Sequence, residues 1–186
     1  MTDGKLLLSH GGFRNLRSFQ CAQGVYDGTV IFCNRFLSKR SRTVDQTVQA
    51  ARSGVQNIAE RSLASATSKK TELTLTGVAR ASLGELFLDY EDYLRQRKLR
   101  HWDKSSPEAL EVRRRYRSDG SDRSDRSELY RFNELSAEVL ANMLICLINQ
   151  ASYLLWQQKK TFEKEFLTGG GFTERMYHAR KNARQK

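Results

Sequence analysis

Positions 43–62 read TVDQTVQAARSGVQNIAERS, and this stretch decides the fold. Thr43 is followed three residues later by Gln46, the spacing of a capping box, which predicts that a helix begins here. Gly54 costs the helix about 1 kcal/mol relative to Ala, so we expect a neighbouring helix to approach closely there. Apolar or small side chains recur at the three- and four-residue intervals of one helical face: Val44, Val48, Ala51, Val55, Ile58 and Ser62.

A second amphipathic helix follows and continues through Leu94. A short polar turn at 66–70 joins the two helices, which predicts an antiparallel helical hairpin. Because a hairpin leaves one face of each helix uncovered, further helices are required. The predicted buried face of the second helix consists of Thr76, Ala79, Leu83, Leu86, Phe87, Tyr90 and Leu94.

Helical patterns also lie on both sides of this hairpin. One runs from about Phe13 to Leu37 and another from about Leu129 to Leu167. With one Pro in 186 residues and 39% hydrophobic residues, the chain suits long helices around a single core. The sequence therefore predicts an all-α fold, an up-down four-helix bundle over 13–167 that follows a leader at 1–12.

The last predicted helix is apolar over more than half of its circumference, whereas a bundle helix usually needs a narrower apolar stripe. We therefore expect it to bury a second face, against a short helix at 107–117 or against another subunit. Glu138, Asn142 and Asn149 are predicted to form its narrow solvent-facing edge. The predicted oligomer interface consists of Leu144, Ile148, Ala151 and Leu155.

A basic insertion at 98–128 separates the third and last bundle helices. Within it, Ser106, Pro107 and Glu108 have the order of an N-cap, a first helical residue and a first-turn acid, which predicts the short helix at 107–117. A linker rich in Ser, Asp and Arg follows that helix. After the bundle, a run of three glycines begins a basic tail at 168–186.

The formal net charge of +11 is concentrated in two segments, with +6 in 95–117 and +4 in 172–186. Basic residues gathered in this way indicate a polyanionic partner, and the alternative is a solvated face that keeps the protein soluble. Trp102 either stacks on a nucleobase or packs within the fold. The predicted nucleic-acid-binding residues are Arg95, Arg97, Lys98, Arg100, Trp102, Arg113, Arg114, Arg115, Arg117, Arg175, Arg180, Lys181 and Arg184.

Catalytic and metal-binding patterns do not stand out in the sequence. The three histidines lie in basic segments or near the N-terminus, without a neighbouring acid and nucleophile. The three widely spaced cysteines are typical of small buried side chains in a reducing compartment. Acidic residues at 85–92 lack the Glu-x-x-His partner of a helical metal site, so a solvated face is expected. The sequence predicts a protein without enzymatic activity, cofactor or metal.

Neither a membrane span nor a secretory signal is expected. No uninterrupted apolar run reaches the roughly 18 residues that cross a bilayer. The first nine residues contain only three consecutive apolar side chains after Lys5, too few for the apolar region of a signal peptide. We therefore expect a cytoplasmic protein without a membrane partner.

Five short runs resemble one protein family: FRNL at 13–16, AARSG at 50–54, NIAE at 57–60, SKK at 68–70 and ASLGEL at 81–86. They are similar to four-helix-bundle proteins that include the ribosomal-RNA intervening-sequence proteins and the accessory variability determinant of diversity-generating retroelements. The resemblance covers 13–94 and, more weakly, 129–167. It implies up-down bundles that assemble into barrel-shaped homopentamers. It also implies, for the retroelement members, nucleic-acid binding and association with a reverse transcriptase.

Two departures from this family pattern matter. Arg61 stands where the family usually has Gly, and about thirty residues separate helices that a short turn joins in the family. The basic tail resembles that of a branch with a C-terminal suffix. The sequence thus predicts a non-enzymatic adaptor that binds RNA or DNA, forms a homopentamer and serves as a candidate accessory subunit of a reverse transcriptase. The alternative is an oligomeric structural or protein-interaction module that binds an acidic protein.

Overall fold

The computed structural model describes residues 12–38, 40–65, 68–118, 131–169, 176–177 and 180–181, and these residues contain helices and no strand. The all-α prediction is therefore confirmed. The predicted leader at 1–12, apart from Gly12, and the predicted linker at 118–127, apart from Ser118, lie outside the described residues. The α-helices are α1 (Arg17–Phe36), α2 (Arg42–Ala64), α3 (Lys69–Gln96), α4 (Pro107–Ser118) and α6 (Ala137–Gly169), with 3₁₀ turns at Phe13–Asn15 and Phe132–Glu134.

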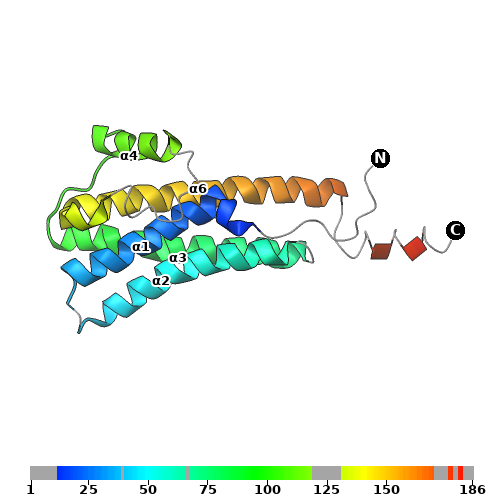
Figure 1. Ribbon diagram of the computed structural model, residues 1–186, viewed down its shortest axis with the longest axis horizontal. Helices are drawn as coiled ribbons and strands as arrows, with labels where there is room; N and C mark the ends of the chain where they lie inside the picture. Colours follow the sequence, from blue (N-terminus) through cyan, green and yellow to red (C-terminus); the bar gives the residue numbers. More distant parts are fainter. Residues whose placement is uncertain are drawn as a thin grey trace.

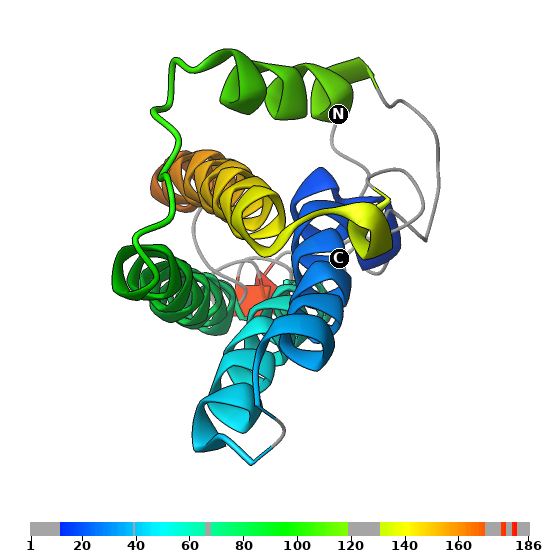
Figure 2. The ribbon, with the colours of Figure 1, turned by 90° about the vertical axis from the view of Figure 1, so that its left-hand side faces the viewer.

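Four of these helices form an up-down bundle, in which each helix lies beside two others (Figure 1). The packed pairs are α1 with α2, α2 with α3, α3 with α6, and α6 with α1, so the chain passes around the core in order. The short helix α4 packs outside this ring, against α6 (Figure 2). This arrangement matches the predicted bundle with one extra helix between its third and fourth members.

Serine side chains set the starts of three helices. The Oγ of Ser41 accepts a hydrogen bond from the backbone of Thr43, so α2 begins one residue before the predicted capping box at Thr43. Ser68 caps α3 in the same way, and Ser106 Oγ accepts from the backbone of Ala109 as the sequence predicts for α4. The predicted start of the last helix near Leu129 is wrong, because α6 begins only at Ala137.

The hairpin of α2 and α3 buries most of the side chains that their periodicity predicts, while Val44, Val48 and Phe87 are half-buried. Leu83 and Ile58 are completely buried, and Gly54 lies directly against Leu83. A Cβ atom added at Gly54 would lie 3.2 Å from Leu83 Cδ2, a spacing tighter than most contacts of real side chains. The expected close approach of a neighbouring helix at Gly54 is therefore confirmed.

A buried polar link joins α3 to α1 across the core. The hydroxyl of Tyr90, 1% exposed, donates to Thr29 Oγ1 at 2.9 Å, and Thr29 in turn donates to the carbonyl of Val25 at 2.7 Å. The Phe32 ring lies edge-on to Tyr90 with 5.1 Å between the ring centroids. Since each buried hydroxyl has a partner, this contact fixes the two helices without leaving an unsatisfied polar group.

At the other end of the bundle, Arg61 joins α2 to α6. It is 3% exposed, donates to Gln158 Oε1 at 2.8 Å, and lies over the ring of Phe162. Burial lowers the pKa of Arg61, and the charge of nearby Glu72 opposes that change. Glu72 also forms an ion pair with Lys69 at 3.0 Å. Arg61 therefore places a buried cation between two bundle helices.

The wide apolar surface of α6 is covered within the chain. α1 and α3 pack against it from the bundle, and α4 covers a further face with buried Ala109 and Val112. The four side chains predicted to form an oligomer interface are at most 1% exposed, so that prediction is wrong for Leu144, Ile148, Ala151 and Leu155. Their apolar surface is buried against helices of the same chain, which removes the need for a second subunit at this place.

By length and composition, one helix in the described ranges, Ala137–Lys164, could cross a membrane. This window contains polar side chains, so it is not an uninterrupted apolar run. It is also 61% buried inside the protein, and a core helix of a soluble bundle meets the same criteria.

Replacing glycines of α2 and α3 with Ala should separate close contacts from open positions. Gly77 and Gly84 have no atoms within 4 Å of an added Cβ, so each substitution should raise the free energy of unfolding by up to about 1 kcal/mol through helix propensity. Gly54→Ala should give no such gain, because its Cβ would press on Leu83. Chemical denaturation measures all three, and an equal gain at Gly54 would contradict the close approach.

Candidate nucleic-acid interface

The residues at 97–106 form an irregular segment that connects α3 to α4 and carries many of the predicted contacts. The segment turns away from α3 at Lys98, which adopts the left-handed conformation with φ of 55°. The backbone amide of Leu99 then donates to the carbonyl of Leu94 at 2.9 Å, which closes the end of the helix. Figure 2 shows the segment rising from the end of α3 to α4, which lies outside the ring of four bundle helices, on the side of α6.

Asn142 of α6 holds this connecting segment in place. Its Oδ1 accepts from the backbone amide of Trp102 at 2.8 Å, and its Nδ2 donates to the carbonyls of Arg100 at 2.8 Å and Glu138 at 2.9 Å. The side chain is 1% exposed, so the predicted place of Asn142 on a solvent-facing edge is wrong. The amide instead satisfies backbone groups of a segment that has no regular secondary structure.

Several predicted cations are already paired with acids of the same region. Arg95 pairs with Asp92 at 2.7 Å and Arg100 pairs with Glu108 at 2.7 Å. On α4, Arg114 and Arg115 both pair with Glu111, and their hydrogen bonds lower the pKa of Glu111 to about 2. These pairs are exposed and therefore screened by salt, so a phosphate can compete for the arginines.

Other cations of the region form no ion pair among the described residues, although the pKa of Asp103 is lowered by its hydrogen bonds and further by the charges of Lys104 and Arg113. Lys98, Lys104 and Arg113 form no ion pair there, and Arg97 lies over the ring of Tyr93 at 3.8 Å from its centroid. Lys98 and Lys104 are exposed, and Arg113 is half-buried on α4. The predicted contacts Lys98 and Arg113, together with Lys104, which was not predicted, are therefore the cations of this region most available to an external anion.

A cavity of about 380 Å³ lies where the connecting segment, α4 and α6 meet. Its lining brings together Trp102, Lys104 and Arg113, which the sequence separates by up to eleven residues. Apolar atoms of Phe87 and Ile145 also line it. Trp102 is half-buried and packs against the hydrophobic core, as one of its two predicted roles requires. Part of its side chain also lines the cavity, where a ligand can reach it.

The cavity also contains residues that the list of predicted contacts omits. His101, Lys104, Cys146 and Asn149 line it together with the predicted Trp102 and Arg113. Lys104 and His101 could have been found from their position in the basic segment. Asn149 and Cys146 carried no such signal, because only the packing of α4 over α6 brings them to the connecting segment.

The two basic segments do not form one described surface. The described residues Arg180 and Lys181 are exposed, and they lie beyond the end of α6, away from α4 (Figure 1). Arg175 and Arg184 lie outside the described residues, as does the side chain of Arg117 at the end of α4. The predicted contacts of the tail therefore stay a prediction.

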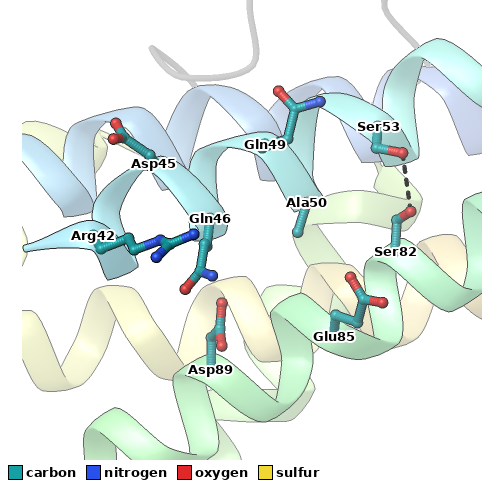
Figure 3. Close-up of a pocket in the computed structure, with 9 residues that line it drawn as sticks. All are labelled: Arg42, Asp45, Gln46, Gln49, Ala50, Ser53, Ser82, Glu85 and Asp89. Atoms are coloured by element: carbon teal, nitrogen blue, oxygen red, sulfur yellow. Dashed lines mark hydrogen bonds between the residues drawn. The ribbon is translucent and has the colours of Figure 1, made fainter.

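A larger open groove of about 750 Å³ runs between α2 and α3 (Figure 3). Its carboxylates come from Asp45, Glu85 and Asp89, and Arg42 is the one cation that lines it. Partial burial raises the pKa of Asp89, which also accepts a hydrogen bond from Thr47 at 2.8 Å. An acidic groove repels phosphate, so this face is a poor nucleic-acid surface.

Among the described residues, no group of three or more His, Cys, Asp or Glu side chains could hold a metal ion. Cys21 and Cys33 are buried, and burial raises the pKa of the Cys33 thiol to about 11. Both thiols therefore pack as small hydrophobic groups, as the sequence predicts. No family model, curated protein or solved structure that was compared with the chain matches it.

Substitution of Asn142 should test its hold on the connecting segment. Asn142→Leu keeps the approximate size but leaves the Trp102 amide and the Arg100 carbonyl unpaired, so the free energy of unfolding should fall by about 1–3 kcal/mol. Asn149→Leu on the same helix is the matched control, since Asn149 is exposed and a change within about 0.5 kcal/mol is expected. Urea denaturation that gave equal losses for both variants would contradict this role.

Proposed function

We propose that the protein is a non-enzymatic nucleic-acid-binding adaptor whose contact surface is the connecting segment at 97–106 together with α4. The observation that carries the proposal is a group of cations that form no ion pair among the described residues: Lys98 and Lys104 on the connecting segment, which Asn142 holds to α6, and Arg113 on α4. Binding there would release counterions from the phosphate backbone, and this release drives sequence-independent affinity.

The location of this surface also supports the proposal. α4 and the connecting segment lie outside the bundle, where an elongated strand can reach them without disturbing the core (Figure 2). The acidic groove between α2 and α3 would repel phosphate and so restrict binding to the basic side. RNA and DNA share the phosphate backbone, so these cations serve either polymer.

The salt dependence of binding tests this surface. Replacing Lys98, Lys104 and Arg113 with Gln should lower affinity and make the log–log salt slope shallower, by about 0.9 for each lost phosphate contact on duplex DNA. The control replaces Lys70, Arg52 and Arg80, exposed cations of α2 and α3, with Gln, and so changes the net charge equally. Titrations at several salt concentrations should show little change for the control.

Two outcomes would contradict the proposal. Equal effects of both triple variants would mean that net charge alone governs binding. If affinity and salt slope were unchanged in both triple variants, the cationic side chains would be a solvated face that does not bind nucleic acid. The alternative, a module that binds an acidic protein, would then be favoured.

We further infer, from the resemblance to the retroelement and intervening-sequence proteins, that the adaptor is a homopentamer and works beside a reverse transcriptase in the cytoplasm. The side chains first assigned to the subunit interface are buried, so an assembly would use other exposed apolar groups, such as Leu63 of α2 or Leu88 of α3. Light scattering at micromolar concentration should give five times the 21.4 kDa chain mass. A monomer mass would remove the assembly from the proposal.

A further inference from the structure

The cavity between the connecting segment, α4 and α6 has the chemistry of a site for a flat, partly apolar ring with a charged attachment. Trp102, Phe87 and Ile145 supply apolar walls, Asn149 supplies an amide, and Lys104 and Arg113 supply cations. Its volume of about 380 Å³ lies at the lower end of the range for ligand sites, about 300–1,000 Å³. It therefore suits a single ring system rather than an extended ligand.

We propose that this cavity receives one unpaired base of a single-stranded nucleic acid, with the base beside Trp102 and its phosphate toward Lys104 and Arg113. The proposal rests on the nucleic-acid-binding function proposed above, and it specifies that the ligand is single-stranded rather than duplex. Proteins that recognise single strands place unstacked bases on aromatic side chains and follow the backbone with cations. A base in a duplex is stacked and paired, so it cannot enter a cavity of this kind.

The charges around the cavity orient the base. Asp103 is the one carboxylate among the lining residues, and its backbone and side-chain hydrogen bonds with Ser105 hold it in place. Asp103 is exposed, and its hydrogen bonds with Ser105 and then the charges of Lys104 and Arg113 lower its pKa, so one carboxylate and two cations act together at this site. A base can donate an amino group to the carboxylate while its phosphate meets the cations.

The walls of the cavity are also fixed before any ligand arrives. Asn142 holds the backbone on both sides of His101, and Arg100 pairs with Glu108 across to α4. A rigid wall loses little conformational entropy when a base binds, which favours affinity. The half-buried Cys146 thiol lies at the same cavity, while the other two thiols of the chain are buried in the bundle.

Tryptophan fluorescence tests the proposal directly. The chain has two tryptophans, so Trp156→Phe leaves Trp102 as the only reporter. A single-stranded oligonucleotide of about ten residues, within the site sizes usual for such proteins, should quench Trp102 in parallel with binding. The matching duplex should bind through the cations with much less quenching.

Substitution of the ring supplies the second arm. Trp102→Leu should weaken single-strand binding about ten-fold or more and leave duplex affinity within about two-fold, since stacking on the aromatic ring is lost while the cations remain. Trp102→Phe should retain most of the single-strand affinity. Trp156→Leu is the matched control, because it removes an indole of α6 that does not line the cavity. Circular dichroism checks that each variant is folded.

Protection of Cys146 in the unaltered chain keeps the proposal testable if Trp102→Leu does not fold. Burial raises the pKa of the Cys146 thiol, so alkylation with iodoacetamide is followed at mildly alkaline pH by mass spectrometry. The single strand should slow this alkylation at least several-fold, and the duplex should not. Equal alkylation rates with and without the single strand would overturn the base site.

The outcomes separate this proposal from the function on which it rests. Loss of affinity in the Lys98, Lys104 and Arg113 variant, with no preference for single strands and no effect of Trp102→Leu, would keep the adaptor and overturn the base site. Absence of binding to any nucleic acid would overturn both. A free mononucleotide that matched the oligonucleotide in affinity would overturn the strand as the ligand.

Discussion

The buried amide of Asn142 satisfies backbone groups of a connecting segment that has no helix or strand of its own. Polar groups buried without partners are costly, so an irregular segment next to an apolar helix needs such a side chain. One asparagine on α6 thereby fixes Trp102 and, through it, one wall of the cavity. The packing of α4 against the same helix supplies the other wall, and the candidate site exists only because both contacts hold.

The basic region contains two populations of cations with different physical roles. Arg114 and Arg115 share Glu111 on one turn of α4, an arrangement that stabilises a solvent-exposed helix with many charges. Lys98 and Lys104 lie on irregular backbone and form no ion pair among the described residues, and the acid four positions after Lys104, Glu108, pairs with Arg100 instead. The net charge does not distinguish these two groups. Arg114 and Arg115 must release the carboxylate of Glu111 before they bind a phosphate, whereas Lys98 and Lys104 need not release a paired acid.

Sequence periodicity was sufficient for the bundle, because the stripes of α2 and α3 report burial directly and Ser106 with Pro107 marks α4 unambiguously. It failed for Asn142, since a polar residue on an apolar helix has the same pattern whether it meets water or a backbone carbonyl. Periodicity also failed for the predicted interface at Leu144. A broad apolar face shows that another segment must pack on it, but it does not show whether that segment belongs to the same chain or to a second subunit. The cavity depends on contacts between segments far apart in sequence, and no local pattern contains them.

α3 ends at Gln96 and α6 begins forty-one residues later at Ala137, at the same end of the bundle (Figure 1). Of the described residues between them, those of α4 pack outside the bundle against α6, whereas Phe132 is buried in the core. The entropic cost of closing a flexible loop grows only with the logarithm of its length, about 0.6 kcal/mol for each doubling. Connections of different lengths between α3 and α6 therefore lower the stability of the bundle by nearly the same amount. A bundle with this connection can exchange the part between Gln96 and Phe132 for another segment that covers the same face of α6, and so acquire a new ligand while its buried residues stay the same.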